Sequence, residues 1–163
     1  MASKVIDKDM GYNKWLRQMK EVAKKPVVNI GVLGTSENQA KDEKGVTLVE
    51  YASANEFGAT GAGRDGSVTI PERSFIRSTM DERKKRFFGK AFQLQEDIFT
   101  GKKSMKTVLS IMGELIKANI VQKIVSLRSP ANAPSTIQGK GSSNPLIDTG
   151  RMRQSIDYEV EGA

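Results

Sequence analysis

The sequence contains neither cysteine nor histidine, and each absence excludes a class of site. Without cysteine the chain forms no disulfide and no thiolate site, which fits assembly in a reducing cytoplasm. Without histidine it lacks the usual general base near neutral pH and the commonest metal ligand. Catalysis would have to use carboxylates, lysines, serines or tyrosines, and the carboxylates show no paired spacing. We therefore expect no enzymatic activity, no metal site and no cofactor.

Long apolar runs are also missing. The chain has no stretch of the roughly 20 apolar residues that a membrane-spanning helix needs, and residues 1–7 lack the apolar block of a signal peptide. Hydrophobic residues make up only 37% of the 163 residues, which indicates long polar loops or arms around one core. We expect a single domain over residues 1–163 and no membrane partner.

Positive charge is in excess, with 26 lysines and arginines against 19 acidic residues and a net charge of +7. Such an excess is typical of contact with nucleic acid or with an acidic protein. The basic run Arg83–Arg86 has no interleaved aromatic or glycine residues, so we interpret it as a solvated helix face. A small basic nucleic-acid-binding protein is the alternative, and strongly salt-dependent DNA binding would favour it.

Three segments have the apolar period of a helix. An amphipathic helix is predicted over residues 10–25 of the N-terminal segment 1–25, with Trp15 in the core. Two longer helices are predicted over residues 79–99 and 104–127.

The two long helices are each expected to bury one stripe. In the first, the buried stripe comprises Met80, Phe87, Ala91, Leu94 and Ile98. In the second, the side away from the core comprises Lys106, Ser110, Gly113, Lys117 and Asn119. Strand patterns occur over residues 27–34 and 157–161. The predicted fold class is α+β, a small antiparallel or mixed sheet packed against two long helices, with an N-terminal helix and long extended loops.

The segment YASANEFG, residues 51–58, ends another helix. Thr47 and Glu50 have the spacing of a capping box, and Gly58 suits the positive φ found where helices end. Phe57 is expected in the core. Glu56, a lone carboxylate beside a helix end, is expected to pair with an arginine.

The segment IPERSFIR, residues 70–77, follows a glycine-rich loop that lacks P-loop spacing. Pro71 is expected to start a helix, so that Arg73 and Arg77 would share a helical face. Phe75 is expected to be an apolar anchor. The two arginines are expected to form structural ion pairs rather than to bind nucleic acid.

The segment NPLIDTGRMRQSI, residues 144–156, contains a predicted helix start. Asp148 is placed to accept hydrogen bonds from the amides of the first turn, ahead of Met152. Loss of such a cap lowers stability by about 1 kcal/mol. We therefore expect Asp148→Ala to leave the subunit folded but to impair its assembly.

In this order, the three segments resemble the YAxxxEFG, IPxRPFLR and PLIDTGRLRxSI motifs of the tail-completion and head–tail joining (neck) proteins of tailed bacteriophages. Ser74 stands where the family pattern has a second proline, which makes the backbone less rigid at that point.

The resemblance implies a structural virion protein, made in the host cytoplasm, that forms a six-fold ring between head connector and tail around the DNA passage. The implied partners are copies of itself, the connector or adaptor, and the tail terminator or tail tube, with non-specific contact to DNA in the channel. The residues assigned to assembly on this basis are Glu56, Phe57, Gly58, Pro71, Arg73, Phe75, Arg77, Asp148, Gly150 and Arg151.

The three motifs are expected to converge in space. The ion pair expected there joins one carboxylate, Glu56 or Asp148, to one guanidinium, Arg73, Arg77 or Arg151. Residues 58–67 and 129–143 are expected to be flexible arms that become ordered on assembly. The arms would carry positive charge from Arg64, Arg128 and Lys140.

Overall fold

The computed structural model describes residues 10–43, 45–63 and 65–163, and the expectations for residues 1–9 lie outside that range. The elements in chain order are α1 (Tyr12–Ala23), β1 (Val27–Val32), α2 (Ser36–Gln39), α3 (Leu48–Phe57), β2 (Ala59–Ala62), β3 (Val68–Ile70), α4 (Arg77–Phe99), α5 (Met105–Ser126), α6 (Pro134–Lys140), α7 (Arg151–Gln154) and β4 (Ile156–Glu161). The predicted α+β class is confirmed. The strands form two separate antiparallel pairs, β1–β4 and β2–β3.

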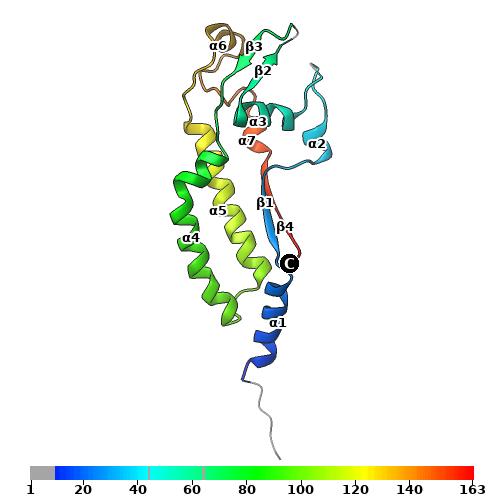
Figure 1. Cartoon of the computed structure of the whole chain (residues 1–163), viewed down its shortest axis with the longest axis vertical. Helices are drawn as coiled ribbons and strands as arrows, with labels where there is room; N and C mark the ends of the chain where they lie inside the picture. Colours follow the sequence, from blue (N-terminus) through cyan, green and yellow to red (C-terminus); the bar gives the residue numbers. More distant parts are fainter. Residues whose placement is uncertain (1–9, 44, 64) are drawn as a thin grey trace, which may run out of the picture.

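The molecule is elongated, with α4 and α5 packed side by side along its length (Figure 1). The β1–β4 sheet packs on α5, so α5 lies between α4 and the sheet. α1 lies at one end of the molecule, and the β2–β3 hairpin lies with α6 at the other. No helix in the described part of the chain is long and apolar enough to cross a membrane.

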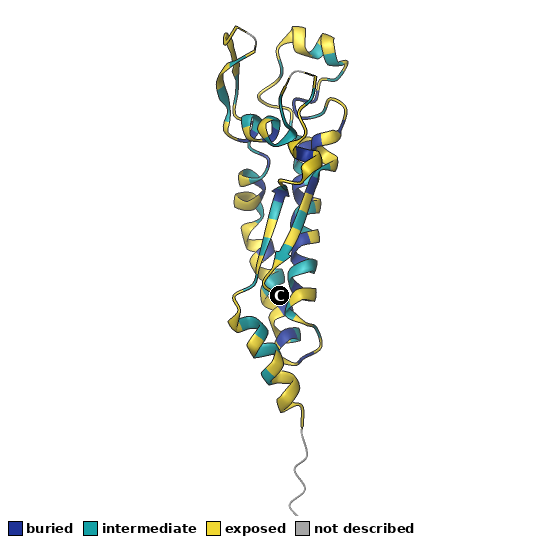
Figure 2. Cartoon of the chain, turned by 90° about the vertical axis from the view of Figure 1, so that its right-hand side faces the viewer, coloured by how far each residue is buried: buried dark blue, intermediate teal, exposed yellow. Residues whose placement is uncertain are grey.

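The β1–β4 sheet joins two segments that are far apart in the sequence. Its register runs from Val27 opposite Glu161 to Val32 opposite Ile156. Exposed and covered residues alternate along β4 and over residues 27–30 of β1, because neighbouring residues of a strand point to opposite faces. Gly31, opposite Asp157, is buried and interrupts the alternation. One face packs on α5, and the other is open to solvent in Figure 2.

α5 is the centre of the core. Ser104 caps it by accepting a hydrogen bond from the amide of Thr107, and Ile120 and Ile124 are completely or almost completely buried. The prediction that Gly113 and Asn119 lie on a solvent side is wrong, since both are buried. α5 is covered by α4 on one side and by the sheet on another, so a single apolar stripe underestimates its buried surface.

Three further predictions about the helices are wrong. Trp15 is not in the core: its side chain is 42% exposed and stacks on Tyr12, with ring centroids 6.1 Å apart. Pro71 does not start a helix, because α4 begins at Arg77. Met80 lies in the first turns of α4 but is exposed, whereas the other four residues of the predicted stripe are buried or half-buried.

The two segments expected to be flexible arms contain regular structure. The first holds β2, which pairs with β3, and the second holds α6. Arg64 lies outside the described residues. Gly58 has the predicted positive φ, 75°, and a Cβ there would come within 3.1 Å of the amide nitrogen of Glu72. Glycine is therefore required where α3 turns into the hairpin.

Candidate functional site

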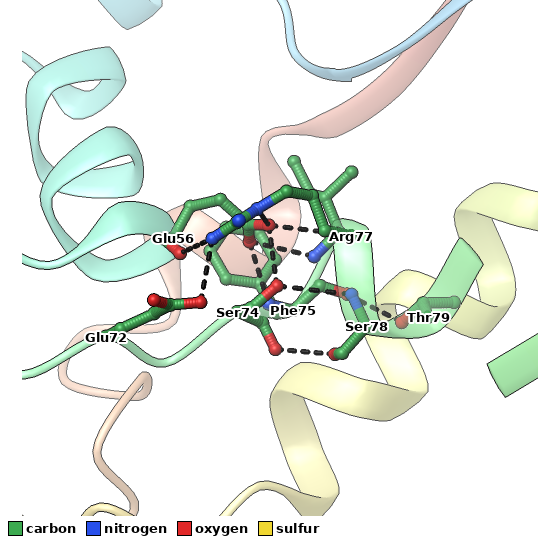
Figure 3. A network of polar contacts seen from close by, with 8 residues as sticks. Glu56, Glu72, Ser74, Phe75, Arg77, Ser78 and Thr79 are labelled. Carbon is green, nitrogen blue, oxygen red and sulfur yellow. Dashed lines mark hydrogen bonds and ion pairs between the residues drawn. The ribbon is translucent and has the colours of Figure 1, made fainter. Parts of the chain in front are cut away.

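Glu56 lies at the centre of the candidate site and connects two of the three motifs. The predicted capping box of Thr47 and Glu50 starts α3, and Glu56 lies in its last turn with only 4% of its surface exposed. Its carboxylate accepts hydrogen bonds from the backbone amides of residues 75, 76 and 77 at 2.7–2.9 Å (Figure 3). It thereby caps the start of α4 from a different helix.

The side chains around this carboxylate complete the network. Ser74 donates its hydroxyl to Oε1 at 2.8 Å, and Arg77 donates its Nε to the same oxygen at 3.2 Å. Arg77 also donates to the Glu56 backbone carbonyl and to the carboxylate of Glu72, both at 2.8 Å. The predicted ion pair between Glu56 and an arginine is therefore confirmed.

The network also determines the charge of Glu56. Burial by itself would raise the pKa of this carboxyl, but the hydrogen bonds from the amides of Ile76, Arg77 and Phe75 and from Ser74 outweigh it, so its pKa is lowered. The amides lie at a helix N-terminus, where the helix dipole also favours negative charge. Glu56 is thus a structural anion that holds residues 74–77 in place.

The neighbouring aromatic residues separate into one buried and one exposed ring. Phe75 is completely buried, as predicted for an anchor. Phe57 was expected in the core, but its ring is 63% exposed and lies under the guanidinium of Arg77, 4.6 Å from carbon to ring centroid. A cation over an aromatic face is stabilising. The ion pairs with Glu56 and Glu72 thus hold Arg77 over Phe57 at the surface.

Arg73 does not share a helical face with Arg77, because the chain before α4 is not helical. Arg73 also forms no ion pair with Glu56 or Asp148, the two carboxylates predicted as its partners. Its guanidinium is buried and donates to the carbonyls of Pro130 and Ala131, at 2.8 and 3.1 Å, and to Asn55 Oδ1 at 3.2 Å. Burial lowers the pKa of Arg73. Arg73 therefore connects the α3 end to the segment that follows α5.

We predict that Arg73→Lys lowers the free energy of unfolding by about 1–3 kcal/mol, because one ammonium group cannot reproduce the fork of the guanidinium and leaves buried acceptors unpaired. Hydrogen exchange in residues 129–133 should become faster. Arg128→Lys is the matched control, since Arg128 is exposed and donates only to nearby carbonyls, of Val125 and Leu127. Equal effects of the two substitutions on stability and exchange would contradict this role for Arg73.

The third motif begins with a cap that was not predicted. Asn144 is buried, and its amide donates to the carbonyls of Ile124 and Val125 at the end of α5. Its Oδ1 accepts from the amide of Leu146 at 2.9 Å. Asn144 therefore provides hydrogen-bond donors to backbone carbonyls at the C-terminal end of α5 and fixes the turn of the chain that follows.

Asp148 does not cap α7. The residue before α7 is Gly150, with φ 82°, and no side chain caps the helix. Asp148 is exposed, and the hydroxyl of Thr149 accepts a hydrogen bond from the amide of Arg151 at 3.4 Å. The structural reason for an assembly defect in Asp148→Ala is thereby removed.

Lys140 was expected to carry arm charge toward a partner, but it turns inward. Its ammonium group donates to the carbonyls of Asn144 and Ile147 at 2.5 and 3.0 Å, and burial lowers its pKa. These bonds fasten α6 to the third motif.

Arg151 lies apart from the Glu56 network. It lines a cavity of about 260 Å³ together with Leu33, Thr35, Glu37, Asn38, Leu48, Gln154, Ser155 and Asp157. Within the described ranges, Arg151 forms no ion pair. The structure thus brings the first two motifs into one network, while the third packs nearby without an ion pair to either.

Sequence reasoning missed two functional side chains in this region. Ser74 was interpreted as a loss of rigidity, yet its oxygen donates to Glu56 and accepts from the Ser78 amide at 3.1 Å. A serine shortly before a helix is a usable capping signal. Asn144 had the corresponding signal for a turn, an asparagine before proline.

No group of three or more histidine, cysteine, aspartate or glutamate side chains in the described part of the chain could hold a metal ion. The chain matches no protein-family model, no curated protein and no solved structure.

Proposed function

We propose that this protein is a structural subunit of the neck of a tailed phage, and that six copies form a ring joining the head connector to the tail around the DNA passage. The observation that carries the proposal is the amount of aromatic surface left in solvent. Phe88 and Phe92 on α4 are 66% and 77% exposed. Monomeric proteins rarely expose large contiguous apolar patches, so such surface is typical of subunits that assemble.

The contacts among the motif residues support the same proposal. The segments that resemble the first two neck motifs meet at Glu56, where they fix the start of α4. Their polar side chains hold the subunit together rather than surround a ligand. A rigid subunit whose functional surface lies elsewhere suits a part in a multisubunit particle.

The test is a nonsense mutation in the coding sequence of the phage that encodes the chain. We expect electron microscopy of the lysate to show DNA-filled heads and separate tails, with few joined particles. Supplying the wild-type protein from a plasmid should restore joining. Normal yields of joined, infectious particles without the protein would refute the proposal.

DNA binding is the second candidate function. Lys84, Lys85 and Arg86 are exposed on α4, and none of them has an ion-pair partner among the described residues. Duplex binding whose affinity falls steeply with salt, and is lost when these residues are neutralised, would favour this candidate.

A further inference from the structure

One side of α4 combines three aromatic rings with two lysines, beside the exposed acidic residues Asp81 and Glu96. Phe88, Phe92 and Phe99 follow each other at intervals of four and seven residues, so they lie on one side of the helix. Lys84 and Lys85 lie at helical spacing from Phe88 and Phe92 and flank this stripe. All five side chains are exposed. We call these five residues the α4 face.

The open side of the β1–β4 sheet carries acidic side chains and no basic one. Its side chains are those of Val27, Asn29, Asp157, Glu159 and Glu161, and all five residues are exposed. Neither strand contains a lysine or an arginine. We call these five residues the sheet face.

The charges of the sheet face are only partly satisfied within the chain. Lys117 of α5 binds Asp157 at 2.9 Å, and the Asn29 amide donates to Glu161 at 2.8 Å. Glu159 has no ion-pair partner in the described residues. Because no positive group of the described chain meets Glu159, this face can accept cations from another molecule.

The two faces match in length but cannot meet within one molecule. The α4 face extends about 22 Å from Lys84 to Phe99, and a six-residue strand such as β4 extends about 20 Å. α5 lies between α4 and the sheet (Figure 1). The open side of the strands faces the viewer in Figure 2 and is flanked only at the Asp157 end, where Asp157 lines a cavity with residues of α2 and α3. Each face is therefore available to a second copy.

We propose that the α4 face of one copy docks on the sheet face of the next copy, with Lys84 and Lys85 against Glu159 and Glu161 and with the aromatic rings supplying apolar contact. The contact is head-to-tail, since each copy uses two different faces, and repetition of such a contact closes into a ring when the rotation permits. This inference rests on the proposed neck ring and assigns its subunit interface.

Two double variants test the pairing. Lys84→Glu/Lys85→Glu makes the α4 face acidic, and Glu159→Lys/Glu161→Lys makes the sheet face basic. In each variant alone, the two faces that meet at every contact carry charge of the same sign and repel each other. Each variant should therefore sediment as a monomer at concentrations where the wild type forms rings. In an equimolar mixture each altered face meets its complement, so the mixture should regain the wild-type ring by sedimentation and electron microscopy.

The matched control is Lys102→Glu/Lys106→Glu, which changes two exposed lysines outside both faces by the same charge and should assemble as the wild type does. Circular dichroism checks that all variants remain folded. In the wild-type ring, a zero-length carbodiimide cross-linker should join Lys84 or Lys85 to Glu159 of another copy.

The outcomes separate this interface from the proposed function. Rings formed normally by both charge variants would overturn the interface and leave the neck function standing. Monomeric variants whose mixture stays monomeric would overturn the head-to-tail pairing. A wild-type protein that never assembles, together with normal particles in its absence, would remove both proposals. Loss of DNA binding in Lys84→Glu/Lys85→Glu with unchanged rings would assign the α4 face to nucleic acid instead.

Discussion

Replacing Glu56 by alanine should lower the free energy of unfolding by about 3–5 kcal/mol, the usual consequence of leaving buried polar partners without their charged counterpart. The substitution removes the acceptor of three backbone amides, of Ser74 and of Arg77. Those amides lie before and within the first turn of α4, where the helix itself offers no acceptor. Chemical denaturation followed by circular dichroism measures the loss.

Two substitutions serve as controls for Glu56→Ala. Glu72→Ala removes the exposed partner of Arg77 and should lower stability by at most about 1 kcal/mol, as is usual for a surface ion pair. Glu56→Gln keeps the shape of the side chain but places an amide donor against backbone donors. Its loss of unfolding free energy should therefore lie between those of Glu56→Ala and Glu72→Ala. A loss from Glu56→Ala as small as that from Glu72→Ala would contradict the capping role.

The same carboxylate should make the protein sensitive to acid. Its pKa in the folded protein is below the ordinary value of 4.5, so its ionised form stabilises the fold above about pH 4.5. That contribution is lost as the pH falls through the folded pKa. The stability difference between wild type and Glu56→Gln should therefore shrink below pH 4.5. A difference that stays constant from pH 7 to strongly acidic pH would show that the charge of Glu56 does not matter.

Adding a methyl group at Gly113 should separate the sheet from α5. A Cβ at this position would lie 2.4 Å from Cδ2 of Tyr158 and 2.6 Å from its Cγ, so the ring and β4 must move. Gly113→Ala should lower stability by about 1–3 kcal/mol, the usual effect of overpacking, and Gly113→Val by more. Thermal and denaturant unfolding measure both changes.

Gly89→Ala is the matched control for Gly113→Ala. Gly89 also lies inside a long helix, but a Cβ there would meet nothing within 4 Å. It should raise stability by up to about 1 kcal/mol, because alanine favours the helix over glycine. In a Tyr158→Ala background, Gly113→Ala should lose most of its penalty. A penalty that persists without the ring would mean that the Tyr158 contact is not its cause.

Much of the secondary structure could be predicted from local pattern. The long helices, the strand β4 and the Thr47–Glu50 capping box follow from spacing over a few residues, which is the range over which helical and strand periods act. The charge pattern also predicted that Glu56 pairs with an arginine. The pattern did not predict that α5 is covered from two sides. Gly113 and Asn119 have no apolar side chains, so they were assigned to the solvent side of the helix, yet both are buried.

The sequence by itself determined the α+β class, the two long helices and the pairing of an arginine with Glu56, a carboxylate beside a helix end. Only the tertiary structure decided the partners of the key side chains. Arg73 binds the carbonyl of Pro130, 57 residues away, and Asn144 caps a helix 20 residues earlier. No short-range period encodes such contacts, since they depend on how the chain folds back on itself. For the same reason the exposure of Trp15 and Phe57 followed from the arrangement of the helices and not from their apolar character.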